Sequence, residues 1–351
     1  MLRKLSNVLR WSLWPLSILY GIVTYIRNYL YNNGLKKIYQ SDIYIINIGN
    51  LTVGGTGKTP HIEYLQQLLS LNWKIAILSR GYGRKTKGYR EVGPHSIAEE
   101  VGDEPLQFYK KFGHQTPVIV CEKRVEGVRR IEKEKPNTQL ILLDDAFQHR
   151  AVGPHLNLLL TDFGRLFYND YVLPMGLLRE FRNGAKRANA VIVSKCPGRL
   201  SEAEKIEIIS QIRCYTLPHT PVFFSTFTYG TSLPYFENIP LLTVGQEVYL
   251  VSGIAQPKLF EGAASTVFKV MGHSALGDHH NFDEEQVRSF VRLSNQYPVL
   301  TTEKDWVKLR PLLEKLSFTE ARFFYWPIQV AFDVPTFDQF ILNEVKKQFR
   351  V

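Results

Sequence analysis

Residues 43–60 read Ile-Tyr-Ile-Ile-Asn-Ile-Gly-Asn-Leu-Thr-Val-Gly-Gly-Thr-Gly-Lys-Thr-Pro. The first part, residues 43–48, is rich in β-branched side chains and predicts a buried parallel strand. Apolar residues then recur at positions 62, 65, 68, 69 and 71, which predicts a helix over residues 61–71. A strand, a Gly-rich loop and a helix in this order are the setting of a phosphate-binding loop. We therefore expect the chain to bind a nucleoside triphosphate.

The predicted loop covers Thr52, Val53, Gly54, Gly55, Thr56, Gly57, Lys58 and Thr59. Its glycines allow the backbone to curl, so that successive N–H groups face phosphate oxygens beside a helix N-terminus. Lys58 is expected to reach the β- and γ-phosphates of ATP, and the Thr59 hydroxyl is expected to bind Mg²⁺. Thr52 stands where the usual pattern has its first Gly, so the match is near rather than complete. An ordinary Gly-rich turn is the alternative.

The rest of the chain alternates strands with helices, which predicts a doubly wound, mostly parallel sheet like that of P-loop NTPases. With 351 residues, 44% of them hydrophobic, the chain can fill two cores. After Pro218 the pattern changes to a second, smaller α/β domain, with strands at 221–228 and 322–330 that could pair as a two-stranded hinge. The predicted divisions are an N-terminal helical segment over 1–40, a core with the phosphate-binding loop over 41–220, the smaller domain over 221–330 and a C-terminal helix over 331–351.

The positive charge of the chain is concentrated at its N-terminus. Six of the ten net charges lie in residues 1–41, which hold no acidic residue. The sixteen residues between Arg10 and Arg27 are uncharged and include two Trp and two Tyr. A bilayer-spanning helix takes about 20 apolar residues, so an amphipathic helix lying at the membrane interface fits better. A hydrophobic helix packed on the domain is the alternative. Because the charge is N-terminal, nucleic-acid binding is not expected.

A second acidic signal follows an apolar strand. Residues 140–143 are Leu-Ile-Leu-Leu, and Asp144 and Asp145 come directly after them. Carboxylates at a strand end commonly hold Mg²⁺ beside a phosphate loop. Asp144 is the first residue past the strand and the better metal candidate, whereas Asp145 can instead cap the next helix. Three widely spaced cysteines give no zinc or disulfide pattern and suit a reducing compartment.

Several motifs in order resemble those of the tetraacyldisaccharide 4′-kinases. They are Asn47 to Pro60, Ser79-Arg-Gly-Tyr-Gly83, Gly102-Asp-Glu-Pro105, Asp144-Asp-Ala-Phe-Gln-His149, Leu173-Pro-Met-Gly-Leu-Leu-Arg-Glu180 and Asp278-His279. The resemblance runs from about residue 40 to about 310, and Ala146 replaces the usual Gly of its motif. It implies an enzyme that acts on a membrane-embedded glycolipid, and we expect this enzyme at the cytoplasmic face of the bacterial inner membrane, as a monomer. The reaction implied is Mg²⁺-dependent transfer of the ATP γ-phosphate to the 4′-hydroxyl of the tetraacyldisaccharide 1-phosphate, a lipid A precursor.

The resemblance also implies roles for individual residues. A sugar hydroxyl needs a proton acceptor, and Asp103 with His279 would form a dyad for this purpose. By the boundaries above, these two residues lie in different domains, so the dyad would form only on domain closure. Arg179 would lie at the γ-phosphate. Glu180 would bind Mg²⁺ together with Thr59, Asp144 and Asp145. The residues expected around the substrates are Arg80, Glu104, Gln148 and His149. A membrane-attached regulatory NTPase is the alternative function, although it leaves Asp103 and His279 unexplained.

Overall fold

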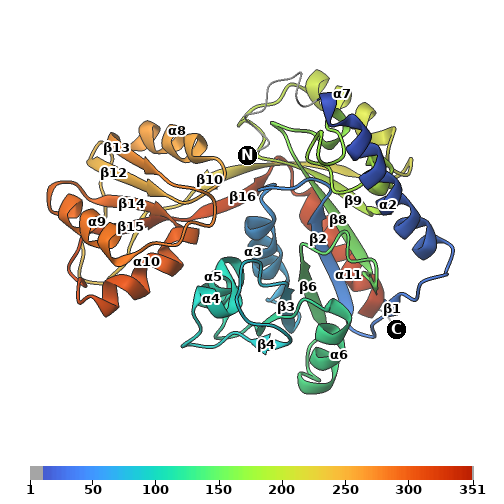
Figure 1. The fold of residues 1–351 in the computed structure, drawn as a ribbon, viewed down its shortest axis with the longest axis horizontal. Coiled ribbons are helices and arrows are strands. Elements are labelled where there is room, and N and C mark those ends of the chain that lie inside the picture. The colour runs from blue at the N-terminus through green and yellow to red at the C-terminus, as the bar shows by residue number, and fades with distance from the viewer. Residues whose placement is uncertain (1–10, 350–351) are drawn as a thin grey trace. The chain divides into compact units, whose positions relative to one another are not determined.

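The computed structural model describes residues 11–349. The chain divides into two compact units, each made of several segments (Figure 1). The first unit comprises residues 1–80, 116–227 and 330–351, and the second comprises residues 81–115 and 228–329. The two units are α/β folds with mostly parallel strands, as the sequence predicts.

The first unit is organised around β2 (Tyr44–Asn50), the strand predicted from the opening stretch. All seven of its residues are buried, because it pairs in parallel with β6 (Leu140–Asp144) on one side and β8 (Leu156–Asp162) on the other. The order of the nine-stranded sheet is β16-β10-β9-β8-β2-β6-β3-β5-β4. Its other strands are β3 (Ile75–Ser79), β5 (Val118–Val120), β9 (Ala190–Ser194), β10 (Val222–Tyr229) and β16 (Ile328–Phe332), together with β4 (Arg90–Glu91) from segment 81–115 of the second unit.

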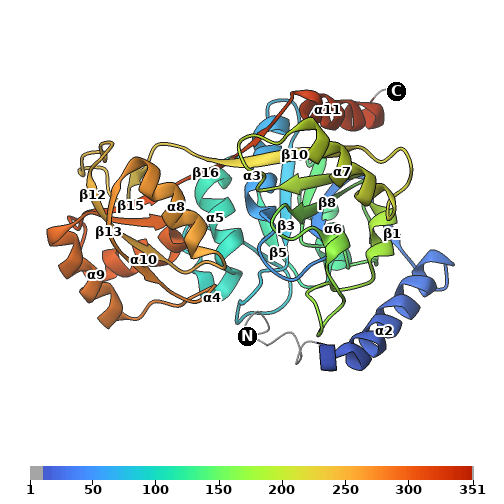
Figure 2. The same cartoon turned by 90° about the horizontal axis from the view of Figure 1, so that it is seen from above.

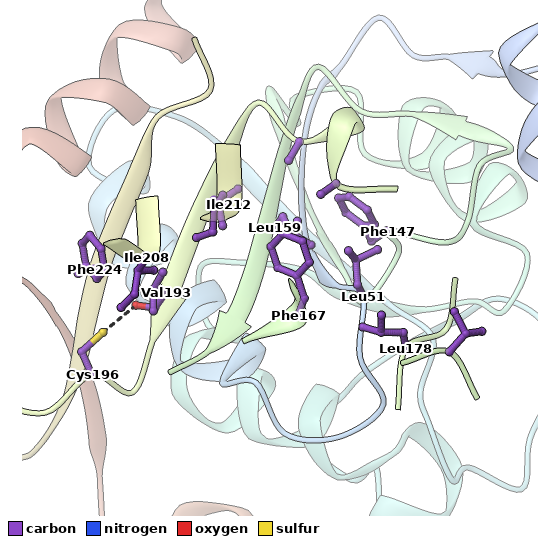
Figure 3. Close-up of a cluster of buried hydrophobic side chains, with 14 residues drawn as sticks. Leu51, Phe147, Leu159, Phe167, Leu178, Val193, Cys196, Ile208, Ile212 and Phe224 are labelled. Atoms are coloured by element: carbon purple, nitrogen blue, oxygen red, sulfur yellow. Dashed lines mark hydrogen bonds between the residues drawn. The ribbon is translucent and has the colours of Figure 1, made fainter. Parts of the chain in front are cut away.

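Helices complete the first unit. They are α2 (Trp14–Asn32), α3 (Lys58–Leu69), α6 (Arg124–Glu134), α7 (Glu202–Arg213) and α11 (Thr336–Phe349), with 3₁₀ turns at Phe167–Asn169 and Arg182–Arg187. Short strands β1 (Tyr39–Gln40) and β7 (Val152–Gly153) pair in parallel. Ile208 and Ile212 of α7 pack with Leu159 of β8 and Val193 of β9 in a buried cluster that also holds Phe167 (Figure 3). This cluster fixes β8 and β9 beside β2, so the carboxyl ends of these strands lie along one edge.

The second unit has its own five-stranded sheet in the order β11-β15-β14-β12-β13. The strands are β11 (Leu233–Pro234), β12 (Glu247–Ser252), β13 (Lys269–Ala275), β14 (Val299–Thr302) and β15 (Phe323–Trp326). The helices are α4 (Ala98–Val101), α5 (Asp103–Phe112), α8 (Pro257–Val267), α9 (Glu284–Gln296) and α10 (Glu303–Lys315). Side chains from β12, α8 and β15 form the core of this unit.

Two predicted boundaries differ from the structure. Residues 81–115, expected in the core over 41–220, belong to the second unit with residues 228–329. The single strand expected over 322–330 is two strands, because Pro327 lacks an N–H group and interrupts it. β15 ends before Pro327 and pairs with β14, whereas β16 starts after it and neighbours β10. The chain passes between the units after residue 80, after residue 115, within β10 and within β16.

The N-terminal helix α2 packs through an unusual face. Its buried residues are the small or polar Ser17, Gly21 and Thr24, one or two turns apart. A Cβ atom at Gly21 would lie 2.3 Å from the ring of Phe181, so glycine permits the close contact. Apolar side chains such as Leu19 and Val23, each 60% exposed, cover the other sides. Figures 1 and 2 both show α2 at the periphery of this unit.

The charged flank of the predicted N-terminal segment is only partly described. Its basic residues Arg3, Lys4 and Arg10 lie outside residues 11–349, as do residues 350–351 of the predicted C-terminal helix. Among the described residues, no helix is long and apolar enough to cross a membrane.

Candidate active site

The Gly-rich loop joins the buried end of β2 to α3. Gly54 and Gly57 have φ values of +116° and +84°, which side chains other than glycine rarely adopt. Gly57 is also the N-cap of α3, and a Cβ atom there would lie 2.5 Å from the ring of Phe227. Two constraints, conformation and space, therefore require glycine at position 57. The positive φ values at Gly54 and Gly57 curl the backbone of the loop.

The residue that departs from the usual motif lies in extended backbone. Thr52 is buried and forms an antiparallel bridge with Leu178. The backbone N–H groups of Val53 and Arg179 donate to the carbonyl oxygens of Leu177 and Leu51, at 2.8 and 2.7 Å. The positive φ that favours glycine does not occur at Thr52. A threonine therefore fits the first position of the loop without strain.

Side chains from β2, β9 and α3 hold the loop in place. Asn50 donates to the Thr56 hydroxyl at 2.9 Å, and the Ser194 hydroxyl donates to the Thr56 carbonyl at 2.7 Å. His61 Nδ1 lies 2.7 Å from the Gly57 carbonyl oxygen. Burial lowers the pKa of His61 to about 4, so its ring is neutral at neutral pH. These bonds preorganise the loop before any ligand arrives.

Lys195, a residue that the sequence analysis did not single out, is bonded to the phosphate loop. It follows β9 and has a φ of +58°. Its ammonium donates to the backbone carbonyl of Gly55 and forms an ion pair with Asp162 at 2.8 Å. These two contacts tie the Gly-rich loop to the carboxyl ends of β8 and β9.

We expect Lys195→Met to weaken ATP binding about tenfold, because a hydrogen bond from a charged group contributes about 1.5–3 kcal/mol. The dissociation constant of a non-hydrolysable ATP analogue, measured by calorimetry, checks this. Lys205→Met is the matched control, because Lys205 pairs with Asp333 in the same unit. Equal affinities for the two variants would contradict a role of Lys195 at the loop.

The lysine of the loop faces a carboxylate from the end of β6. Lys58 Nζ lies 3.6 Å from Asp145 Oδ1, and Arg179 binds both carboxylate oxygens of Asp145 at 2.9–3.1 Å. Burial alone would raise the pKa of Asp145, but the charges of Lys58 and Arg179 outweigh it and hold the pKa below its ordinary value. The structure thus brings three of the predicted residues together beside the loop.

Asp144 is the other carboxylate of this pair and is buried at the end of β6. Its Cα is paired with that of Ile48 in β2, just before the loop. Asp144 Oδ2 accepts a hydrogen bond from the Ser79 hydroxyl at 2.8 Å, and its backbone carbonyl accepts one from Arg124 at 2.9 Å. Burial lowers the pKa of the Arg124 guanidinium to about 10. Arg124 is a buried cation beside both acidic residues that the sequence analysis did not identify.

Glu180 occupies a different environment from the expected metal shell. It is fully buried. Its carboxylate accepts from Arg187 at 2.7 Å, from Asn28 at 2.6 Å and from Gln148 at 3.1 Å. These bonds engage both of its oxygens, and Asn28 comes from α2. Glu180 therefore links α2 to the site through the hydrogen bond from Asn28, and we do not assign it to Mg²⁺.

Three further candidates lie around these groups. Gln148 also accepts a hydrogen bond from Arg179 at 3.3 Å, so it is part of the same network. Burial, followed by the charges of Arg124 and Arg80, lowers the pKa of His149 to about 4. His149 is therefore neutral at neutral pH. Arg80 is exposed at the end of β3.

The second unit contains the expected dyad. His279 Nδ1 lies 3.0 Å from Asp103 Oδ2, and Asp103 is the first residue of α5. Residues 103 and 279 belong to the same unit, so the expectation that the dyad forms only on domain closure was wrong. The physical reason is that α5 packs on α10 within the second unit. Glu104, the next residue, is half-buried.

The residues above match a known family. The chain matches the sequence model of the tetraacyldisaccharide-1-P 4′-kinases over residues 9–346. The chain belongs to this family. It is 42% identical over 348 residues to the tetraacyldisaccharide 4′-kinase of Flavobacterium psychrophilum, with 97% of this chain and 98% of that protein covered. It is 38% identical over 338 residues to the enzyme of the same name from Cytophaga hutchinsonii, with 95% and 94% covered.

A solved structure agrees with this assignment. The crystal structure of the "apo" form of LpxK from Aquifex aeolicus in complex with ATP matches with a TM-score of 0.75 and 29% identity, covering 96% of this chain and 99% of that one. The chain is thus an ATP-dependent kinase of lipid A synthesis, which confirms the expected family and activity. The regulatory NTPase alternative is not favoured.

Family membership leaves the individual site residues to be argued from their contacts. Sequence reasoning missed Lys195, Arg124 and Lys308, all of which contact predicted site residues. A sequence pattern could have identified Lys195 as a site residue, since it directly follows a predicted strand at the carboxyl edge of the sheet. No sequence pattern pointed to Arg124 or Lys308, because isolated basic residues on predicted helices usually face solvent.

Proposed function

We propose that the chain transfers the γ-phosphoryl group of ATP to the 4′-hydroxyl of the tetraacyldisaccharide 1-phosphate. The observation that carries this proposal is the buried Asp103 carboxylate, held through Oδ2 by His279. A protein that only binds ATP needs no such base, whereas a sugar hydroxyl must lose its proton as it attacks phosphorus. The curled phosphate loop supports the ATP half of the proposal.

In the proposed reaction, the oxygen of the 4′-hydroxyl forms a bond to the γ-phosphorus of ATP. The bond between that phosphorus and the β–γ bridging oxygen breaks, and ADP leaves with the electron pair. The hydroxyl proton passes to Asp103 and is then released to water. Lys58 and Arg179 offset the negative charge on the transferred group, because positioned cations act strongly on phosphoryl transfer.

The donor set beside the loop fits Mg²⁺. Magnesium is usually held by one or two carboxylates together with substrate phosphates and water, not by an all-protein cage. No cluster of three or more His, Cys, Asp or Glu side chains suited to a metal occurs in residues 11–349. Thr59 and Asp144 would hold the ion, since both carboxylate oxygens of Asp145 are bonded to Arg179. When bound, the ion would neutralise charge on the β- and γ-phosphates.

The exposed apolar sides of α2 support attachment to a membrane. A helix that buries Ser17, Gly21 and Thr24 and exposes Leu19 and Val23 is amphipathic in the opposite sense to an ordinary surface helix. We propose that this helix lies in the interface of the inner membrane, at the cytoplasmic face where ATP is present. The enzyme would act there as a monomer, with β10 and β16 as the hinge strands.

Replacing Leu19 and Val23 by glutamate is expected to lower recovery on anionic lipid vesicles about tenfold or more. Each apolar side chain contributes about 1.5–3 kcal/mol when it is fully removed from water. Cosedimentation with the vesicles measures the effect. Leu71→Glu is the control, because Leu71 is 85% exposed elsewhere in the same unit. Undiminished recovery of the double variant would refute membrane attachment through α2.

Incubation with γ-labelled ATP, Mg²⁺ and the tetraacyldisaccharide 1-phosphate in detergent micelles tests the kinase proposal. We expect label to appear in the lipid, and a chelator of Mg²⁺ to abolish its transfer. Label released only as inorganic phosphate would mean that the protein hydrolyses ATP and is not a lipid kinase.

A further inference from the structure

A third side chain completes the Asp103–His279 pair. Lys308 lies on α10, and its side chain is only 6% exposed. Its ammonium donates a hydrogen bond to Asp103 Oδ2 at 3.0 Å, the same oxygen that His279 contacts at 3.0 Å. One carboxylate oxygen therefore carries both contacts. No hydrogen bond joins the other oxygen, Oδ1, to a residue within 11–349.

Lys308 also holds the segment that carries His279. Its ammonium donates to the backbone carbonyl of His280 at 2.7 Å and lies 6.0 Å from the ring centroid of Phe282. His279 itself has a φ of +57°, a conformation that its surroundings must stabilise. A single buried ammonium thus connects α5, which carries Asp103, with the loop that carries His279.

We propose that Lys308 is a positioning residue of the phosphoryl transfer, which fixes Asp103 through Oδ2 and leaves Oδ1 to accept the proton of the acceptor hydroxyl. This inference rests on the proposed function and extends it to a named atom. A carboxylate held by one oxygen keeps a fixed direction for the other. Fixing the carboxylate in this way lowers the free-energy barrier to phosphoryl transfer, because the Asp103 side chain loses less conformational freedom when the acceptor hydroxyl reaches it.

The electrostatics of the cluster agree with this arrangement. Burial would raise the pKa of Asp103, but the hydrogen bond from His279 and the charge of Lys308 outweigh it and lower the pKa. Asp103 therefore remains ionised, as a proton acceptor must be. The other carboxyl group facing Lys308 is Asp305, one turn earlier on α10, whose pKa burial raises. Asp278 lies 3.9 Å from His279 Nε2 and pairs with Lys304 at 2.9 Å.

Lys308→Met tests the inference. We expect kcat for lipid phosphorylation to fall about 100-fold, while the dissociation constant of an ATP analogue changes less than twofold. Removal of the ammonium should raise the pKa of Asp103, so the acidic limb of the kcat/KM profile should move to higher pH. Lys308→Arg keeps a charged donor. Its kcat should be at least tenfold higher than that of Lys308→Met, and the acidic limb of its kcat/KM profile should return to the pH of the unaltered enzyme. Lys315→Met on the same helix is the control, because Lys315 forms an exposed pair with Glu284.

A double variant separates positioning from folding. If Lys308 acts through Asp103, adding Lys308→Met to Asp103→Asn should slow the enzyme less than threefold further. A further 100-fold loss, or an unmoved acidic limb in Lys308→Met, would overturn the inference. If the Met variant does not fold, Lys308→Gln, which keeps a hydrogen-bond donor without the charge, gives the same pH measurement. Absence of lipid phosphorylation by the unaltered enzyme would instead refute the proposed function itself.

Discussion

Asp103→Asn is expected to lower kcat for lipid phosphorylation about 10³-fold. The asparagine side chain has nearly the same shape and can still accept hydrogen bonds from His279 and Lys308 through its carbonyl oxygen. It cannot take up a proton from the acceptor hydroxyl, and a positioned general base commonly contributes about 10²–10⁴-fold. Single-turnover measurement at saturating ATP and acceptor reports this loss.

Affinity for ATP is the internal control for that variant. Asp103 belongs to the second unit, whereas the phosphate loop and Lys58 belong to the first. We therefore expect the dissociation constant of an ATP analogue to stay within twofold of the unaltered enzyme. A variant that keeps full turnover would show that Asp103 is not the base, and one that loses ATP affinity as well would place Asp103 in nucleotide binding.

Lys58→Ala, unlike Asp103→Asn, is expected to impair both ATP binding and turnover. It removes a cation from the phosphates and from Asp145, whose pKa the Lys58 charge helps to hold down. Loss of one preorganised donor to developing charge typically costs about 10²–10³-fold in rate. We expect kcat/KM for ATP to fall about 10³-fold and the ATP dissociation constant to rise at least tenfold.

Lys74→Ala is the matched control for this variant, because Lys74 is exposed in the same unit. Initial rates over a range of ATP concentrations distinguish the two effects. A Lys58 variant with unchanged ATP affinity and an unchanged rate would mean that the Gly-rich loop is not the nucleotide site.

The first unit was predictable because its signals are local. A β-branched run, three glycines and a Gly-Lys-Thr triplet lie within 20 residues, and the structure places β2, the loop and α3 there. The strands that end at Asp144 and Ser194 were also predictable, since an apolar run indicates both where a strand lies in the chain and where it ends. Parallel strands then bring their carboxyl ends to one edge.

The contacts within the second unit could not be predicted from local sequence patterns. Asp103 and Lys308 are 205 positions apart, and their contact depends on the packing of α5 against α10. Helical periodicity identifies the buried face of α10 but not which distant carboxylate meets it. The assignment of 81–115 failed for the same reason, because this segment follows strand β3 in sequence yet packs with residues 228–329. The buried hydrogen-bond environment of Glu180 was not predictable, because its partner Arg187 lies on a 3₁₀ turn with no pattern of its own.

The position of the phosphate in the product tests the central claim most directly. Phosphorus–proton correlation NMR of the purified lipid identifies the proton coupled to the new phosphorus. We predict coupling to the proton on carbon 4′, with the original 1-phosphate unchanged. A new phosphorus coupled to another ring proton, or a diphosphate at position 1, would contradict the account.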